Sequence, residues 1–206
     1  MLQNYLKIAW RNLRKNKSTS FINIAGLATG MAVAMLIGLW MHDELSFNKY
    51  HKNYERLAQV YIHQSFNGHI GSGQAMAFPT AEALRTNFGS DFKYVARTFW
   101  NADHLLANGE TKLLDVATYV DPDFPRMFSL ELVQGNYDDV LREPNSVLLS
   151  QSAATALFGD ENPMGKTLRA DQRADVQVTG VYKDLPPGSS FQQKFFLPWA
   201  NFEAME

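Results

Sequence analysis

The 206-residue sequence contains no cysteine. Disulfide bonds, thiolate metal sites and cysteine nucleophiles are therefore excluded, and a folded domain must be held by its hydrophobic core. Acidic residues are absent before Asp43. Five of the 19 Lys and Arg lie in the first 17 residues, which leaves 14 for the rest of the chain against all 21 Asp and Glu. An acidic domain argues against nucleic-acid binding, which needs cations to neutralise phosphates.

Motifs for phosphate binding are also lacking. The nearest approach to a P-loop is Gly165-Lys166-Thr167. Five residues separate it from Gly159 where a P-loop has four. The pattern also predicts a helix before these residues and a strand after them, whereas a P-loop joins a strand to a helix. We therefore interpret the segment as a turn.

The histidines show no metal-ligand spacing, and we expect them at the surface or partly buried. They are His42, His51, His63, His69 and His104. The paired acids Asp138-Asp139 lie in a polar, turn-like stretch, where a solvated face is the usual outcome. Because no convergent set of polar residues is evident, we expect no catalytic site, no cofactor, no metal site and no enzyme activity.

Charge is absent from one long stretch, the 24 residues from Ser18 to Met41. About 20 residues of helix cross the apolar core of a bilayer, so the sequence predicts a transmembrane helix at residues 18–41. Basic flanks stay on the cytoplasmic side, which places residues 1–17 in the cytoplasm and the chain after about Met41 outside. A cleaved signal peptide is the alternative, because Ala32-Val33-Ala34 resembles a cleavage site. The apolar run is, however, too long for a signal peptide.

The first 17 residues predict an amphipathic helix. Apolar side chains would share one stripe and basic side chains the other side, as in helices that lie on an anionic membrane surface. The apolar stripe consists of Leu2, Tyr5, Leu6, Ala9 and Leu13. The basic residues are Lys7, Arg11, Arg14, Lys15 and Lys17. A basic flank without structure of its own is the alternative.

Small residues recur every four positions inside the apolar stretch. They are Gly26, Gly30, Ala34 and Gly38. Residues at this spacing share one face of a helix and let a second membrane helix approach closely. We therefore expect a helix-packing face, against the alternative that Gly and Ala are simply frequent in membrane helices.

Residues 42–206 predict an α+β domain of short strands and helices. Helices are expected from Pro79 to Gly89 and from Ser150 to Gly159, because each begins at a proline or a capping serine and ends at a glycine. Asp121 is expected to cap a third, short helix that would continue from Pro122 to about Phe128.

Strands and turns complete the predicted domain. Alternation of apolar and polar residues predicts strands at 94–100, 104–107, 112–120, 145–149, 165–168, 174–182 and 194–198. Asn108-Gly109 predicts a two-residue hairpin turn, because both turn positions need positive φ. Gly68, Gly71 and Gly73 predict a loop.

Several blocks of the sequence, taken in order, resemble one protein family. The head KIAWRNLRKNK joined to FINIAGLATGM is similar to the start of the FtsX-like, or MacB-like, permeases of bacterial ABC transporters. Phe47–His51 resembles the family's segment just past the first membrane helix, although Asn48 stands where an acid is usual. Later blocks follow the order of the family's periplasmic core domain: Asp121, Phe124, Phe128, Gly135, Ser150, Leu157-Phe158-Gly159, Asn162–Lys166 and Val178–Val181.

The resemblance implies three parts. Residues 1–17 would be a cytoplasmic basic amphipathic helix, 18–41 a transmembrane helix, and 42–206 an incomplete periplasmic MacB-like core domain. Family members have at least four membrane helices, so we expect the chain to be the N-terminal part of a permease in the bacterial inner membrane.

The resemblance also implies a function. A separate cytoplasmic ABC ATPase would drive movement that the permease passes to its periplasmic domain, to export or extract a substrate. Implied partners are that ATPase, other permease helices or a second permease copy, and the anionic membrane surface. The alternative is a single-pass membrane-anchored sensor or adaptor whose periplasmic domain binds a ligand or a partner.

Overall fold

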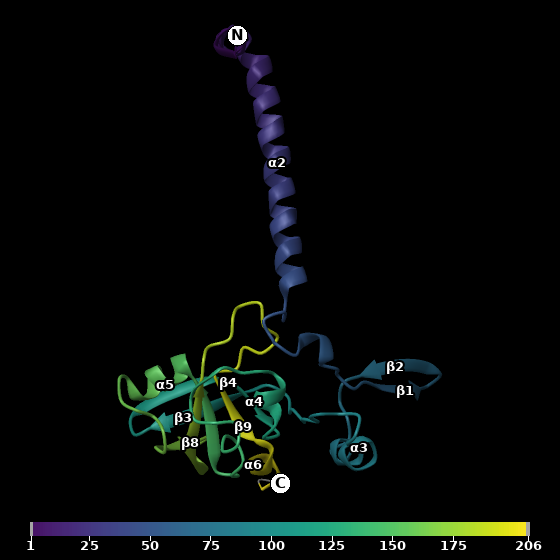
Figure 1. Ribbon diagram of the computed structural model, residues 1–206, viewed down its shortest axis with the longest axis vertical. Coiled ribbons are helices and arrows are strands. Elements are labelled where there is room, and N and C mark those ends of the chain that lie inside the picture. The colour runs from purple at the N-terminus through teal and green to yellow at the C-terminus, as the bar shows by residue number, and fades with distance from the viewer. Residues whose placement is uncertain (1, 205–206) are drawn as a thin grey trace. The chain divides into compact units, whose positions relative to one another are not determined.

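The computed structural model describes residues 2–204, apart from the side chains of Leu2, Gln3 and Leu6. Two positions of the predicted apolar stripe, Leu2 and Leu6, therefore lie outside the described side chains, and the end of the predicted range 42–206 lies outside the described residues. The chain divides into two compact units, Met1–Phe47 and Asn48–Glu206. Figure 1 shows helices alone in the first unit and a sheet with short helices in the second.

The first unit consists of helix α1, Leu2–Lys15, and helix α2, Lys17–Ser46. Helix α2 has 30 residues and is about 45 Å long, which exceeds a bilayer core of about 30 Å. Within residues 2–204 it is the one helix long and apolar enough to cross a membrane. None of its residues is buried in the chain, so its apolar side chains do not serve as the core of the domain.

Helix α2 is longer than the predicted span of residues 18–41. It begins at Lys17 and continues through His42–Ser46, until Phe47 adopts an extended conformation. The charge-free run marks where the chain is apolar, and it does not mark the helix end, because Glu44 and Leu45 are good helix formers. The predicted domain range 42–206 therefore starts inside the helix.

The second unit is built on a seven-stranded mixed sheet of order β5-β8-β6-β9-β4-β3-β7. Strand β7 pairs with β8 as well as with β3, so six of the described strands close into a ring. The β4–β9 and β6–β8 pairs are parallel and the remaining pairs are antiparallel. The strands are β3 Ala102–Asn108, β4 Thr111–Val120, β5 Leu132–Gln134, β6 Ser146–Ser150, β7 Thr167–Ala170, β8 Ala174–Tyr182 and β9 Phe195–Pro198.

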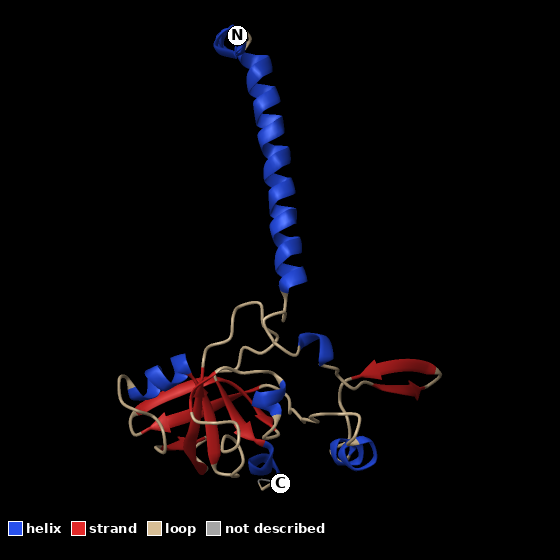
Figure 2. Ribbon diagram, viewed as in Figure 1, coloured by secondary structure: helices blue, strands red, loops and turns tan. Residues whose placement is uncertain are grey.

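The second unit also contains short helices, as Figure 2 shows. They are the 3-10 helix η1 Tyr54–Arg56 and the α-helices α3 Thr80–Phe88, α4 Phe124–Met127, α5 Gln151–Phe158 and α6 Trp199–Glu203. The predicted capping of α5 is confirmed, since the Ser150 hydroxyl accepts a 3.1 Å bond from the Ala153 amide and Gly159 follows the helix at φ 59°. Helix α3 likewise lies between Pro79 and Gly89.

The sheet is buried on both faces, because alternate residues of its central strands enter two different core clusters. Val147 and Leu149 of β6 pack in the first cluster with helix α5, whereas Leu148 packs in the second. Strand β9 follows the same alternation, with Phe196 in the second cluster. The second cluster is closed by Phe124 of α4 and includes Tyr182 at the end of β8.

A separate hairpin replaces the loop predicted at Gly68, Gly71 and Gly73. Strands β1, Ile62–Phe66, and β2, His69–Gly73, form a two-stranded antiparallel sheet. Asn67 and Gly68 make its two-residue turn with φ of 50° and 80°. This is the same Asn-Gly signal that the sequence offers at residues 108–109, and glycines within β2 do not prevent pairing.

Two further expectations on turns and strands are wrong in detail. The hairpin of β3 and β4 turns at Gly109-Glu110, because Asn108 pairs with Thr111 and its side-chain amide donates to the Leu157 carbonyl. The predicted strand at 94–100 is reduced to a single bridge between Thr98 and Val120. The turn predicted at Gly165 is confirmed, with φ of 74° and strand β7 starting after it.

Asp121 does not cap the short helix. Helix α4 starts later, at Phe124, with Asp123 at the capping position and no capping bond from a side chain. The Asp121 carboxylate instead accepts hydrogen bonds from Arg85 and Arg97, which come from earlier parts of the chain. The helix loses its predicted cap because two guanidinium groups bind the carboxylate more favourably than backbone amides would.

Candidate functional site

The segment that follows helix α2 is held by the domain. We call residues 48–53 the junction segment, because Phe47 is the C-cap of α2 and Asn48 opens the second unit. Asn48 adopts a left-handed conformation with φ of 60°, which asparagine tolerates better than most residues. The chain therefore turns sharply at the first residue of the junction segment.

Asn48 makes three hydrogen bonds with one loop of the domain. Its side-chain amide donates to the Ser190 hydroxyl at 2.6 Å and accepts from the Ser190 backbone amide at 2.8 Å. Its own backbone amide donates to the Gly188 carbonyl at 2.8 Å. A carboxamide supplies both a donor and an acceptor, so asparagine satisfies both polar groups of Ser190.

Tyr50 adds a second bond to the same loop. Its hydroxyl lies 2.6 Å from the Ser189 hydroxyl, and Ser189 is buried. Burial raises the pKa of Tyr50, and the hydrogen bond to Ser189 opposes this rise only in part. The phenol therefore stays neutral and can donate or accept in this pair.

His51 is the most buried residue of the junction segment, with 4% of its surface exposed. Its Nδ1 lies 2.6 Å from the Phe128 carbonyl oxygen, which can only accept, so Nδ1 carries the proton. Its Nε2 is buried, and no group in residues 2–204 that the structure describes forms a hydrogen bond with it. Burial lowers the pKa of His51, although the bond to Phe128 opposes this shift, so the environment favours the neutral imidazole.

Aromatic rings surround the imidazole of His51. Its centroid lies 3.9 Å from that of Tyr50, 5.4 Å from that of Phe128 and 6.2 Å from that of Phe191. Phe128 and Phe191 also pack against the second core cluster, where both contact Phe124. The junction segment is thus in contact with the hydrophobic core as well as with the surface loop.

Asn53 completes the attachment at the end of helix α4. Its side-chain amide donates to the Met127 carbonyl at 2.9 Å and to the Ser129 hydroxyl at 3.1 Å. The last carbonyls of a helix lack partners within the helix, so this bond satisfies one of them. Residues 48–53 therefore bind two places of the domain, residues 127–129 and residues 188–190.

The loop that receives Asn48 and Tyr50 is itself tightly organised. It runs from β8 to β9, the two strands on either side of β6 in the sheet. Ser189 accepts from the Phe191 amide at 3.0 Å, and the Gln192 side chain donates to the Ser189 carbonyl at 2.8 Å. Tyr182 donates to the Gln193 carbonyl at 2.5 Å. Displacing the junction segment would therefore act on a loop that is firmly tied to the sheet.

A polar cleft borders the junction segment. It is lined by Tyr50, Lys52, Arg126, Ser129, Leu130, Glu131, Leu132, Gly135, Asn136, Tyr137, Asp138, Lys183, Asp184, Leu185 and Pro186. Two of its cations are paired, Arg126 with Asp138 at 2.8 Å and Lys183 with Glu131 at 3.4 Å. Exposed, paired charges of this kind do not make a ligand site by themselves.

Two other polar clusters contain residue types that also occur in catalytic sites. His104 Nδ1 lies 2.7 Å from Asp171, but among the described residues no hydroxyl is hydrogen-bonded to this imidazole. Asp171 also accepts from the Leu105 amide at 2.8 Å, so the pair fixes the turn after β7. Ser152, Lys194 and Asp184 form the second cluster, in which the carboxylate accepts from the Ser152 amide at 2.9 Å and caps helix α5.

The buried ion-pair cluster lies around Asp121. Arg97 contacts this carboxylate at 2.8 Å and Arg85 at 2.5 Å. Burial alone would raise the pKa of Asp121, but the hydrogen bonds from Arg97 and Arg85 outweigh it and hold the pKa below its usual value. Arg97 also stacks 4.5 Å over the Trp199 ring and contacts Glu203. The cluster fastens the chain after α3 to the sheet.

The predicted basic residues lie where the sequence places them, on helical backbone and exposed. Lys7, Arg11, Arg14 and Lys15 are on α1, and Lys17 is the first residue of α2.

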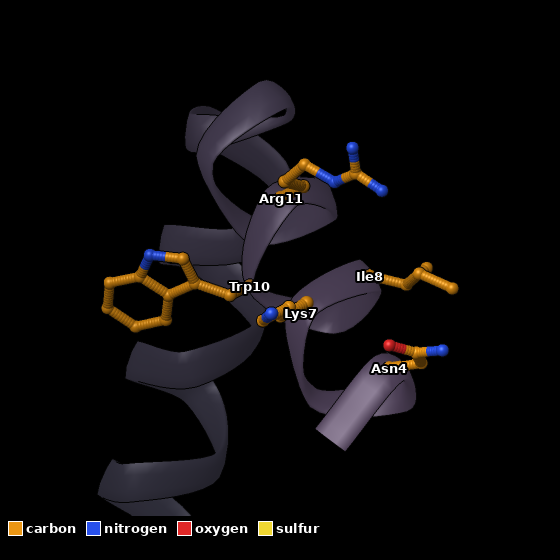
Figure 3. Close-up of a pocket in the computed structure, with 5 residues that line it drawn as sticks. All are labelled: Asn4, Lys7, Ile8, Trp10 and Arg11. Atoms are coloured by element: carbon orange, nitrogen blue, oxygen red, sulfur yellow. The ribbon is translucent and has the colours of Figure 1, made fainter. Parts of the chain in front are cut away.

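A hollow on α1 is lined by Asn4, Lys7, Ile8, Trp10 and Arg11. In Figure 3, Trp10 points away from Asn4, Ile8 and Arg11. Because all five side chains belong to one helix and diverge, the hollow is not an enclosed ligand site.

The predicted packing face remains open in the structure. Gly26, Gly30, Ala34 and Gly38 are exposed residues of α2. A methyl group built on any of the three glycines would meet no atom within 4 Å. Whether a second helix packs on this face stays a prediction.

Sequence reasoning overlooked the junction segment as a site. It predicts all histidines at the surface or partly buried, whereas His51 is buried, and it interprets residues 185–190 as a loop without a binding role. The available signal was the concentration of side chains with both donors and acceptors in this segment, namely Asn48, Tyr50, His51 and Asn53. Their partners lie 74 to 142 residues away, and no local pattern could identify them.

Comparison with known proteins identifies the domain. Residues 20–206 match the MacB-like periplasmic core domain family. No curated protein matches the chain. The chain resembles a domain of a protein described as a permease from Porphyromonas gingivalis, with 26% identity and a TM-score of 0.53 over 63% of this chain and 55% of that one.

Two further solved structures are similar. The periplasmic region of MacB from Actinobacillus actinomycetemcomitans has 24% identity and a TM-score of 0.43, over 56% of this chain and 53% of that one. The extracellular domain of the noncanonic ABC-type transporter YknZ from Gram-positive bacteria has 18% identity and a TM-score of 0.50, over 63% and 65%. The chain therefore spans between 53% and 65% of the length of these three solved structures.

Proposed function

Because the chain belongs to the MacB-like periplasmic core domain family, we propose that it is the N-terminal part of a permease subunit that passes movement from a separate cytoplasmic ABC ATPase to a periplasmic domain. The family match and the apolar helix α2 describe a membrane-anchored component of a transporter permease with an external domain. Coupling to an ATPase, and export or extraction of a substrate, are the further steps of the proposal.

The attachment of the junction segment supports this proposal most directly. Helix α2 ends at Ser46, and two residues later the chain is hydrogen-bonded to the domain through Asn48. A flexible linker between membrane helix and domain would absorb any movement of the helix. A segment bonded at residues 127–129 and 188–190 instead passes that movement to the core.

The membrane arrangement follows from charge and composition. The basic residues of α1 support a cytoplasmic N-terminus, with α1 on the anionic surface of the bacterial inner membrane and the domain in the periplasm. The face of Gly26, Gly30, Ala34 and Gly38 would pack against other permease helices or a second permease copy. We propose no enzymatic activity for the chain, and its described polar clusters are accounted for by capping and ion pairing.

The test uses ATP-dependent movement in native membranes. A spin label at Ala156→Cys, an exposed position on helix α5 of this cysteine-free chain, reports the distance between two permease copies. We expect the distance distribution to change between ADP and ATP with vanadate, and to stop changing when Asn48→Ala and Ser190→Ala are combined.

A matched control keeps the label and replaces Lys49 by Ala, since the exposed Lys49 side chain lies beside Asn48 in sequence. This variant should retain the full ATP-dependent change. Identical distributions in ADP and in ATP with vanadate, in membranes that contain the ATPase, would contradict the proposal. They would favour the single-pass sensor or adaptor.

A further inference from the structure

His51 has a titratable atom in an unusual position. The residue has 4% of its surface exposed, with Nδ1 bonded to the Phe128 carbonyl and Nε2 without a partner among the described residues. This arrangement is compatible with a neutral imidazole, because an unprotonated Nε2 is an acceptor that merely receives no hydrogen bond. A protonated imidazole would place a charge and an additional N–H group in the same buried space.

Charged groups near the junction segment do not offer a counterion to this imidazole. On its own segment the neighbours are Tyr50, bonded to Ser189, and the exposed Lys52. From helix α4, Arg126 is paired with Asp138. On the strand and loop side, Lys183 is paired with Glu131, and Asp184 with Lys194.

None of these groups forms a hydrogen bond or an ion pair with His51 in the described part of the chain. The aromatic side chains of Tyr50, Phe128 and Phe191 pack around the ring. The face of Tyr50 attracts a cation, but it cannot accept the proton of Nε2 as an oxygen would. Protonation therefore leaves an unsatisfied donor unless the segment moves.

We propose that His51 makes the junction pH-sensitive: the neutral imidazole keeps residues 48–53 docked on residues 127–129 and 188–190, and protonation releases them. This inference rests on the proposed function for its consequence, which is that acidification of the periplasm would uncouple helix α2 from the domain. The docking itself is a property of the chain alone.

The direction of the pH dependence of docking follows from the difference between the pKa of His51 in the docked and undocked states. Burial lowers the pKa of docked His51 below its ordinary value of 6.5, and the bond to Phe128 opposes this only in part. Docking is therefore at full strength above pH 6.5 and weakens as the pH falls below it. The ratio of undocked to docked segment should rise by up to about tenfold per pH unit, until the pKa of the docked state is reached.

The experiment measures docking in the full chain in lipid nanodiscs. Spin labels at Lys49→Cys and Ala156→Cys, both exposed and both in the second unit, report the distance from the junction segment to helix α5. We expect one narrow distance distribution at pH 7.5 and a second population that grows below pH 6.5. The same background with His51→Gln, which keeps an N–H donor but does not titrate, should show one population throughout.

A control variant, His63→Gln, removes an exposed histidine on β1 and should leave the pH response intact. An unchanged distribution in the parent chain between pH 7.5 and 5, or an equal response with His51→Gln, would overturn the proposal. If His51→Gln does not fold, the ring carbon resonances of histidine in the parent chain decide. A His51 titration that coincides with loss of docking supports the proposal, and a titration without loss of docking overturns it.

Failure here would not affect the proposed function. The ATP-dependent distance change at Ala156 is measured at constant pH, so it can be present whether or not docking responds to acid. Conversely, a pH-dependent release without any ATP-dependent change would support the docking switch and contradict the coupling to an ATPase.

Discussion

Asn48 and Ser190 hold one another through reciprocal hydrogen bonds: the Asn48 amide donates to the Ser190 hydroxyl, and the Ser190 backbone amide donates to the Asn48 oxygen. The two residues are 142 positions apart. Tyr50 bonds the same loop, whereas His51 and Asn53 bond residues 127–129. The Asn48–Ser190 pair is the first of these contacts along the chain, so it fixes the point at which the chain enters the domain. Its strength can be tested separately from any transport assay.

Replacing Asn48 by Ala should loosen the junction segment. Two side-chain hydrogen bonds disappear, and at a partly exposed site we expect a loss of about 1 kcal/mol in the free energy of docking. Hydrogen exchange of the amides of residues 48–53 should then be about fivefold faster. Lys49→Ala is the control and should leave exchange unchanged. Equal exchange in Asn48→Ala and the parent chain would show that the bonds do not hold the segment.

Replacing Asp121 by Asn should destabilise the domain by about 3 kcal/mol, because two guanidinium groups lose their buried counterion. Chemical unfolding followed by tryptophan fluorescence measures this, since Trp199 stacks on Arg97. Asp175→Asn removes the exposed partner of Arg169 and should leave the unfolding midpoint unchanged. If both variants unfold alike, the buried cluster contributes no more than a surface pair.

Acid should remove the contribution of Asp121 in a defined window. Its pKa in the folded chain lies below the ordinary value of 3.8, because the hydrogen bonds from Arg97 and Arg85 outweigh the effect of burial. The stabilisation is therefore complete well above pH 3.8 and is lost as the pH falls through the folded pKa. The free energy of unfolding of Asp121→Asn should depend less on pH below 3.8 than that of the parent chain. Parallel curves would contradict this prediction.

Replacing Gly68 by Ala should weaken the β1–β2 hairpin. Gly68 occupies the turn at φ of 80°, and an L residue there costs about 1 kcal/mol. A two-stranded hairpin is only marginally stable by itself, so local exchange protection in residues 62–73 should fall markedly. Gly71→Ala, within β2, is the matched control, because its methyl group would meet no atom closer than 4.0 Å. A larger loss with Gly71→Ala would contradict the assigned turn.

Replacing Gly30 and Gly38 by Leu should weaken association of the permease in membranes. Bulky side chains at these positions would keep a second helix from approaching the packing face. Cross-linking or fluorescence transfer between copies measures the loss. Ala32→Leu is the control, since Ala32 lies on the opposite side of α2 from this face. If all three substitutions act alike, the spacing of small residues reflects composition alone.

Features set by neighbouring residues could be predicted from the sequence. Helix α5 begins at Ser150 and stops at Gly159 because a hydroxyl cap and a glycine act within one turn of the helix. The existence of helix α2 could also be predicted from consecutive residues, because the apolar stretch is long enough to cross a bilayer. The Asn67-Gly68 hairpin was equally readable, and it was missed because the three nearby glycines favoured a loop.

Features set by residues far apart in the chain could not be predicted from the sequence. Asp121 has the sequence of a helix cap, but Arg85 and Arg97 reach it from 36 and 24 positions away. The sequence predicts His51 at the surface or partly buried, whereas in the structure it is buried beside Phe128 and Phe191, which lie 77 and 140 positions later in the chain. The candidate site consists almost entirely of such long-range contacts, whereas most of the helix ends depend on local ones.

The loop that binds the junction segment connects β8 and β9, and both are interior strands of the closed ring with β6 between them. A pull on Asn48 would therefore be shared among three strands that are bonded on both sides. It would not start at an edge strand, from which a sheet can be peeled one hydrogen bond at a time. Under the proposed coupling, force from helix α2 would enter the sheet at interior strands, which favours movement of the domain as one body over separation of its strands.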